Sequence, residues 1–179
     1  MVETFPIVPL RSTLGTWIVL FLAVVPLLIG AAMATVIPAG GVVVALISLC
    51  AAAALAYAFR GSRKARFEVS PAGLRLRGDF YGRLIPRAEL RVDEARAVDL
   101  RAERALAPAR RTFGTALPGY EAGWFRLRDR QRALLYLTDR SRVAYVPTTA
   151  GYAVLVSVAD PAAFVGSLHR LRRAAAAGA

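Results

Sequence analysis

The pattern of apolar and polar residues divides the chain into one long apolar segment and a longer alternating region. Leu14–Phe59 contains no Asp, Glu, Lys, Arg or His, and Pro38–Gly41 separates it into two runs. Leu14–Ile37 is long enough for a membrane-spanning helix, which needs about 20 apolar residues, and Val42–Phe59 is near the short limit. A soluble helix of this length would show a polar face. The pattern therefore predicts a transmembrane helical hairpin over residues 14–60.

The charges beside this hairpin predict its orientation. The residues that follow the second run are basic, whereas the turn between the runs carries no charge. Basic residues next to a spanning segment stay on the cytoplasmic side. The first run also exceeds the 7–15-residue apolar core of a signal peptide, so we expect it to remain uncleaved. These features predict a multi-pass membrane protein with both termini in the cytoplasm.

Beyond the hairpin, apolar and polar residues alternate with a period of two, which is typical of half-buried strands. The alternation predicts strands at Phe67–Val69, Leu74–Arg77, Arg83–Pro86, Ala95–Leu100, Gly123–Arg128, Ala133–Thr138, Arg142–Pro147 and Tyr152–Val158. Ala133–Thr138 is apolar on both faces, so we expect it to be central. We expect Asp139–Ser141 and Thr148–Gly151 to be hairpin turns.

Other segments carry weaker signals. Residues 101–111 fit either a short helical turn or an arginine-rich loop, and residues 112–119 contain two glycines and a proline that favour irregular structure. Residues 1–13 form a short tail in which Pro6 and Pro9 argue against regular structure. Residues 174–179 form a tail at the other end.

A helix is predicted after the last strand. Asp160 suits the N-cap and Pro161 the first helical position. Phe164, Leu168 and Leu171 share one face of this helix. We therefore expect a bent sheet or partial barrel of about seven strands, with the helix closing one open end through Phe164 and Leu168.

The order of several short motifs resembles that of a known family. The motifs are Tyr81–Pro86, Arg111–Gly114, Pro118–Tyr120, Gly123–Phe125, Thr138–Asp139, Val146–Thr148, Ser157, Asp160–Pro161 and Phe164. Through them, roughly Arg66–Arg173 resembles the bacterial pleckstrin homology-like (PH-like) domains found behind two transmembrane helices, and we expect residues 61–173 to form this domain in the cytosol. The resemblance implies a mainly β domain capped by a C-terminal helix and a place in the bacterial inner membrane. It implies no catalytic residues, because the family shares none.

Positive charge is the strongest chemical signal. The net charge of +12 lies entirely after the apolar segment, because Glu3 and Arg11 cancel before it. An acidic lipid surface attracts basic residues that lie near it. Two plainer explanations stay open: a solvent-exposed strand face is commonly charged, and positive-inside topology alone explains a basic cluster beside a membrane span. The candidate contacts with anionic headgroups are Arg60, Arg63, Lys64 and Arg66 beside the membrane, and Arg75, Arg77, Arg126 and Arg128 on outward strand faces, which form one patch if their strands are neighbours.

Catalytic and cofactor signals are weak. His169 is the only histidine and Cys50 the only cysteine, which cannot make the usual zinc sets. Ser157 and Asp160 are poorly placed for a triad with His169, and the glycines match no phosphate loop. We therefore expect no enzyme activity, metal, cofactor or nucleic-acid partner.

Three functions follow, in order of preference. The first is a non-enzymatic integral membrane protein whose PH-like module binds a protein partner or the acidic membrane surface. The second is an accessory or scaffold subunit of a larger membrane complex, in which small residues of the second run (Ala45, Ser48, Ala52 and Ala56) either pack against the first run or support association. The third is an enzyme of unknown type.

Overall fold

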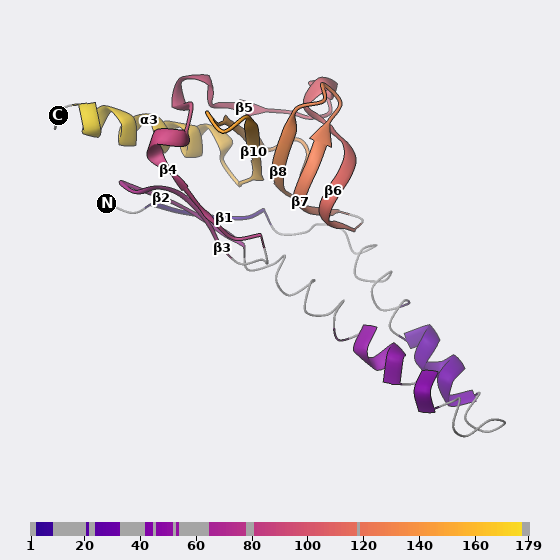
Figure 1. Cartoon of the computed structure of the whole chain (residues 1–179). Coiled ribbons are helices and arrows are strands. Elements are labelled where there is room, and N and C mark those ends of the chain that lie inside the picture. The colour runs from indigo at the N-terminus through magenta and orange to yellow at the C-terminus, as the bar shows by residue number, and fades with distance from the viewer. Residues whose placement is uncertain are drawn as a thin grey trace. The chain divides into compact units, whose positions relative to one another are not determined.

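The computed structural model divides the chain into two compact units, one of which is discontinuous in sequence (Figure 1). The first unit combines Met1–Leu10 with Arg63–Ala179, and the second is Arg11–Ser62. The structure describes residues 3–8, 21, 24–32, 42–44, 46–51, 53, 65–77, 81–117 and 119–176.

The second unit contains the predicted hairpin. Its described residues 24–32, 42–44 and 46–51 are helical, and Ser48 Oγ donates to the carbonyl oxygen of Val44 at 2.8 Å. Among the described residues, no helix is both long and apolar enough to span a bilayer. The rest of the predicted hairpin, including Trp17, the turn at Pro38–Gly41 and Phe59, lies outside the described residues.

The first unit begins with a four-stranded antiparallel sheet in the order β1-β2-β3-β4. Its strands are β1 (Glu3–Pro6), β2 (Arg66–Ser70), β3 (Gly73–Arg77) and β4 (Leu84–Pro86). The expectation that the N-terminal tail lacks regular structure is wrong for β1. Pro6 is tolerated because it ends an edge strand, where its missing N–H breaks no ladder.

A second sheet of six strands has the order β5-β9-β10-β8-β7-β6. Its strands are β5 (Arg96–Val98), β6 (Pro108–Leu117), β7 (Tyr120–Leu127), β8 (Arg132–Leu137), β9 (Val143–Pro147) and β10 (Tyr152–Ser157). Strand β10 pairs antiparallel with β9, which confirms the predicted hairpin, and it pairs parallel with β8. Asp139–Ser141 is therefore no hairpin turn but a crossover, because β10 lies between the strands that it joins.

Strand β6 occupies most of the stretch that was predicted to be irregular. Gly114 of β6 lies opposite Gly123 of β7, and a β-carbon on Gly123 would lie 2.6 Å from the Gly114 Cα. Gly123 also has a φ of 109°, which favours glycine. Gly114, one of the glycines that suggested a loop, therefore permits close strand pairing instead. Two register shifts interrupt the β6–β7 pairing, between Pro108 and Arg110 and between Arg111 and Phe113.

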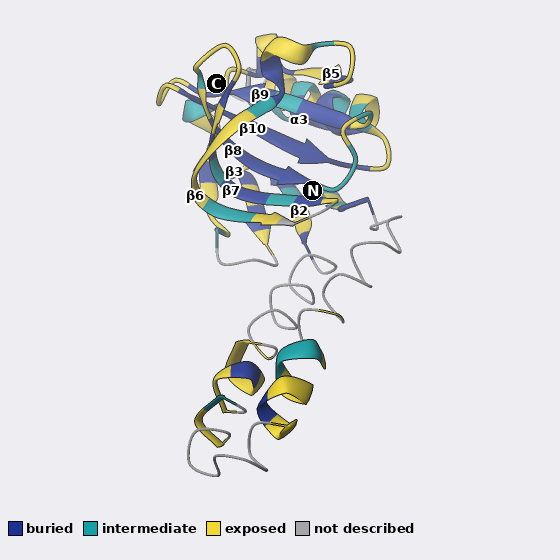
Figure 2. Cartoon of the chain, turned by 90° about the vertical axis from the view of Figure 1, so that its right-hand side faces the viewer, coloured by how far each residue is buried: buried dark blue, intermediate teal, exposed yellow. Residues whose placement is uncertain are grey.

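The six-stranded sheet is covered on both faces, which explains why its central strands are apolar throughout (Figure 2). On one face, Leu134 and Tyr136 of β8 pack in a core with Phe67 and Leu74 of the four-stranded sheet. On the other face, alternate residues of the same strand pack with Leu106 and its neighbours. The prediction of a central strand here is confirmed. Three short 3-10 helices, η1 (Arg87–Glu89), η2 (Val92–Glu94) and η3 (Arg104–Leu106), lie in the connections.

The helix α3 (Pro161–Ala176) completes the domain. Its first turn is capped by Asp160, whose Oδ1 accepts from the Ala163 N–H at 2.9 Å. Phe164 and Leu168 are fully buried, as predicted, and α3 packs against β2, β5, β9 and η2. The mainly β domain with a C-terminal helix agrees with expectation, but the described residues form ten strands in two sheets rather than about seven in one.

Candidate functional site

The residues of the first unit that flank the apolar segment lie side by side. The Ile7 N–H donates to the Ala65 carbonyl oxygen at 3.1 Å, and β1 pairs antiparallel with β2 just before this point. Val8 is held as well, because its N–H donates to the Ser157 carbonyl at 3.2 Å and its carbonyl accepts from Thr138 Oγ1 at 2.7 Å. The β1–β2 pair is thus a hairpin whose connection is the whole apolar segment.

A cationic surface lies next to this exit point. Arg66 is the first residue of β2 and is in register with Arg77 of β3, and both side chains are exposed. Arg75 is exposed on the same outward face of β3, as the alternation predicted. Glu68 forms an ion pair with Arg77 (Oε1 to Nε, 3.2 Å). We call Arg66, Arg75 and Arg77 the outer arginine face; with Glu68 included, three positive charges stand against one negative charge.

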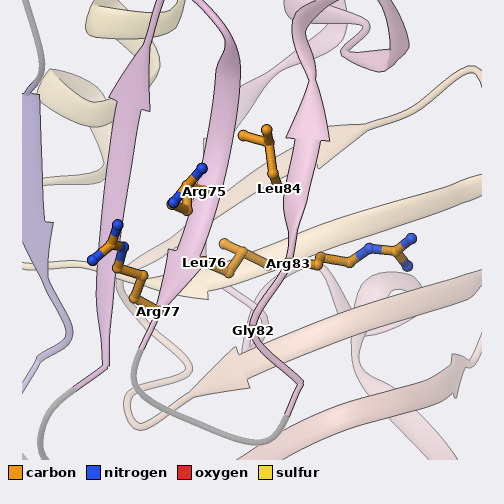
Figure 3. Close-up of a pocket in the computed structure, with 6 residues that line it drawn as sticks. All are labelled: Arg75, Leu76, Arg77, Gly82, Arg83 and Leu84. Atoms are coloured by element: carbon orange, nitrogen blue, oxygen red, sulfur yellow. The ribbon is translucent and has the colours of Figure 1, made fainter.

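A shallow pocket of about 520 Å³ adjoins the outer arginine face (Figure 3). Leu84 of β4 is in register with Arg75 and is 38% exposed, so an apolar side chain lies beside the guanidinium groups. Arg83, the preceding residue, extends away from Arg75 and Leu84. The residues that line the pocket are Arg75, Leu76, Arg77, Gly82, Arg83 and Leu84.

The single patch that was predicted from the sequence does not form as one surface. Arg126 and Arg128 are exposed, but they lie on β7 and in the turn after it, and β3 and β7 belong to different sheets. Arg126 donates instead to the Arg130 carbonyl oxygen at 3.2 Å. The predicted contacts Arg60, Arg63 and Lys64 lie outside the described residues.

Another group of basic and aromatic residues was missed by sequence reasoning. The guanidinium carbon of Arg83 lies 5.8 Å from the ring centroids of both Trp124 and Tyr152, and that of Arg132 lies 5.2 Å from the Trp124 ring. The Trp124 and Tyr152 rings meet edge to face at 5.1 Å. We call Arg83, Trp124, Arg132 and Tyr152 the arginine–aromatic cluster. No sequence signal finds it, because the four residues come from four strands or their flanks.

Tyr152 is the most buried member of this cluster. Tyr152 is 8% exposed, and its hydroxyl oxygen is buried with no hydrogen-bond partner among the described residues. Burial raises the pKa of the Tyr152 phenol, partly opposed by Arg83 and reinforced by Glu89. The phenol therefore stays protonated at neutral pH and keeps a donor.

Two of the residues weighed for catalysis, Ser157 and Asp160, form hydrogen bonds with the backbone. Ser157 Oγ donates to the Asp139 carbonyl oxygen at 2.7 Å and accepts from the Thr138 and Asp139 N–H groups. Burial raises the pKa of Asp139, but hydrogen bonds from Ser141 and the charges of Arg101 and Arg142 outweigh this and lower it overall. In the described part of the chain, no three His, Cys, Asp or Glu side chains are grouped to hold a metal ion.

The domain as a whole matches one family of known proteins. The sequence model of the family described as "Bacterial PH domain" matches residues 65–172, which include every strand after β1 and the first three quarters of α3. No curated protein and no solved structure matches the chain.

Proposed function

We propose that this chain, which belongs to the bacterial PH domain family, is a non-enzymatic interaction module that the apolar segment anchors in the bacterial inner membrane. In this proposal the outer arginine face contacts the acidic surface of the cytoplasmic leaflet. The basic residues Arg60, Arg63 and Lys64 beside the second run support a cytoplasmic domain with both termini on that side.

The pairing of the residues that flank the apolar segment carries the proposal. Since Ile7 and Ala65 are hydrogen-bonded, the chain leaves and re-enters the domain at one place. A segment with this path crosses a bilayer an even number of times, if it crosses at all. Two apolar runs, at 14–37 and 42–59, match two crossings.

The same geometry would place the outer arginine face near the lipid headgroups. Arg66 and Arg77 form the row of the sheet next to Ala65, and Arg75 is two residues further along β3, about 7 Å by the rise of a strand. Each basic residue near an anionic leaflet contributes about 1 kcal/mol of attraction, which falls off over a Debye length of about 8 Å. The excess of two charges over Glu68 therefore supports weak, salt-sensitive binding of about 2 kcal/mol.

Vesicle binding tests this proposal without the anchor. Residues 9–64 are replaced by a short Gly/Asn linker that joins Val8 to Ala65, which gives a loop-closed domain that keeps β1. We expect this domain to bind anionic phosphatidylserine vesicles at low salt and neutral phosphatidylcholine vesicles little. Gln substitution of Arg66, Arg75 and Arg77 should abolish most of the binding.

The matched control removes the same charge elsewhere. Gln substitution of Arg104, Arg128 and Arg130, all exposed in η3 and the β7–β8 turn, should leave most of the binding intact. Equal losses in the two triple variants would show that net charge and not the outer arginine face is responsible. Equal binding to neutral and anionic vesicles would refute the lipid contact.

Phe113 favours a protein partner as the second candidate function. It is 67% exposed on the edge strand β6, where it meets Tyr81 edge to face at 5.7 Å. By contrast, Tyr120 is buried and does not contribute to a surface patch. A full-length Phe113→Ser variant that melts like the wild type but loses a protein co-purified in mild detergent would support this candidate; unchanged co-purification would count against it.

A further inference from the structure

Further arginines lie in register with the arginine–aromatic cluster and add to its positive charge. Arg132 of β8 lies directly opposite Arg126 of β7, and Arg126 lies opposite Arg110 of β6. Like charges that face each other across strands destabilise a sheet. The next residue in this row, on β10, is Tyr152. Three arginines in register thus lead across the sheet to a buried phenol.

Within the part of the chain that the structure describes, these charges have no carboxylate in an ion pair with them. Among the described residues, Arg83, Arg110, Arg126 and Arg132 take part in no ion pair, although seven other arginines do. Of the described acidic residues, Glu89 is the one whose charge raises the pKa of Tyr152. Arg83 and Arg132 are instead held against the Trp124 ring, an arrangement that fixes guanidinium groups while leaving their N–H donors available.

Tyr152 supplies the second, independent observation. A buried hydroxyl without a partner is unfavourable unless something satisfies it. Its neighbour Arg83 lies over its ring, and Arg132 is beside it in register. An oxyanion bound between these two guanidinium groups would give the phenol an acceptor. The site would then combine two charged donors, one neutral donor and an aromatic wall.

We propose that the arginine–aromatic cluster is a binding site for a phosphate group, held by Arg83 and Arg132 with a hydrogen bond from the Tyr152 hydroxyl. This site shares no residue with the outer arginine face. Arg83 also lines the pocket beside that face, but its side chain extends away from Arg75 and Leu84 (Figure 3). The phosphate group can belong to a soluble phosphate or to a lipid headgroup with a terminal phosphate. The shared chemistry is a tetrahedral oxyanion, which suits guanidinium donors.

Tryptophan fluorescence measures binding at this site directly. The chain has two tryptophans, Trp17 and Trp124, so a full-length Trp17→Phe variant reports on Trp124 alone. This protein is placed in nanodiscs of neutral lipid and titrated with inorganic phosphate at constant ionic strength, with chloride as the counter-titration. A parallel series contains phosphatidic acid in the nanodiscs. A saturable change with phosphate identifies a soluble ligand, and a change confined to phosphatidic acid identifies a lipid.

Variants in the same background decide whether the cluster is responsible. Arg83→Gln and Arg132→Gln should each weaken the response at least tenfold. Arg128→Gln removes an equal charge in the nearby turn and should change it less than twofold. Tyr152→Phe removes only the hydroxyl, so it should weaken binding severalfold. The melting temperature should stay unchanged or rise, because the hydroxyl has no hydrogen-bond partner to lose among the described residues.

Three results would overturn the site. The first is a response to phosphate no larger than that to chloride, together with no response to phosphatidic acid. The second is wild-type affinity in both arginine variants. The third is a Tyr152→Phe variant that binds normally but melts at a lower temperature, which would assign the phenol a structural role alone. None of these outcomes bears on the outer arginine face, whose test uses other residues.

Discussion

Removing the Phe164 ring tests whether β1 and α3 share one core. Phe164 is fully buried, and its ring meets that of Phe5 in β1 edge to face at 5.1 Å and 80°. Truncation of a buried phenylalanine to alanine costs about 3–5 kcal/mol, because apolar contact is lost and a cavity remains. A domain of this kind has a total stability of about 5–15 kcal/mol. We therefore expect Phe164→Ala to remove a large part of it.

The contact with Phe5 predicts a coupling free energy between the two rings. An aromatic pair contributes about 0.5–1.5 kcal/mol beyond its buried area. In a double-mutant cycle with Phe5→Ala, the two losses should therefore be non-additive by about that amount. This coupling is specific to the structure described here, because it requires the segment before the apolar runs to pack on the C-terminal helix.

The assay is denaturant unfolding of the loop-closed domain and its variants. Phe164→Ala should lower the denaturant concentration at the unfolding midpoint. The dependence of the unfolding free energy on denaturant should stay unchanged, because it reports the surface exposed on unfolding. Phe113→Ala is the matched control, because Phe113 is 67% exposed, and it should cost less than about 1 kcal/mol. Equal losses for the two variants, or strict additivity with Phe5→Ala, would refute this account of the core.

Three further predictions follow from single positions. Gly123→Ala should lower the free energy of unfolding by about 3 kcal/mol or more, through backbone strain and steric overlap with Gly114. Gly151→Ala is the control, because Gly151 has a φ of 79° but open space around it, and it should cost about 1 kcal/mol. Similar melting temperatures for the two variants would contradict the close β6–β7 pairing. Because the pKa of Asp139 is lowered in the folded state, its carboxylate stabilises the fold above the unfolded pKa, and this stability is lost as pH falls through the folded pKa. Asp139→Asn should therefore reduce the loss of stability at acidic pH when unfolding is measured as a function of pH. An unchanged acid dependence would contradict this. A reporter that is active only in the cytoplasm, fused after Ala179, should be active, and activity confined to a periplasmic reporter at that site would reverse the proposed orientation.

The alternation of residues predicted most of the strands well. Leu74 and Leu76 keep one face of β3 apolar, and β10 is a continuous buried run, so in each strand the local pattern was sufficient. Asp160 and Pro161 likewise predicted the start of α3, because cap chemistry is local. These elements share one property, namely that the evidence for each lies within its own residues.

The remaining elements depended on partners that are distant in sequence. Strand β1 is short and contains Pro6, and its partner β2 follows only after the whole apolar segment. Strand β6 contains Gly114, which looks like a breaker until Gly123 is placed opposite. The crossover at Asp139–Ser141 looks like a turn because the insertion of β10 beside β8 is set by sheet order.

The candidate sites divide in the same way. The outward direction of Arg75 and Arg77 followed from alternation alone and is confirmed by their exposure. The prediction that they form one patch with Arg126 required β3 and β7 to be neighbours, and these strands lie in different sheets. The arginine–aromatic cluster needed the register of three strands and the approach of Arg83 from another sheet.

Membrane extraction of the full chain beside the loop-closed domain tests the central claim most directly. Both proteins are produced in bacterial cells, and the membranes are washed with alkaline carbonate, which releases peripheral proteins. The account predicts that the full chain stays in the membrane pellet and that the loop-closed domain is soluble and unfolds cooperatively, because Ile7 and Ala65 already lie together. Release of the full chain by carbonate, or a loop-closed domain that does not fold, would contradict it.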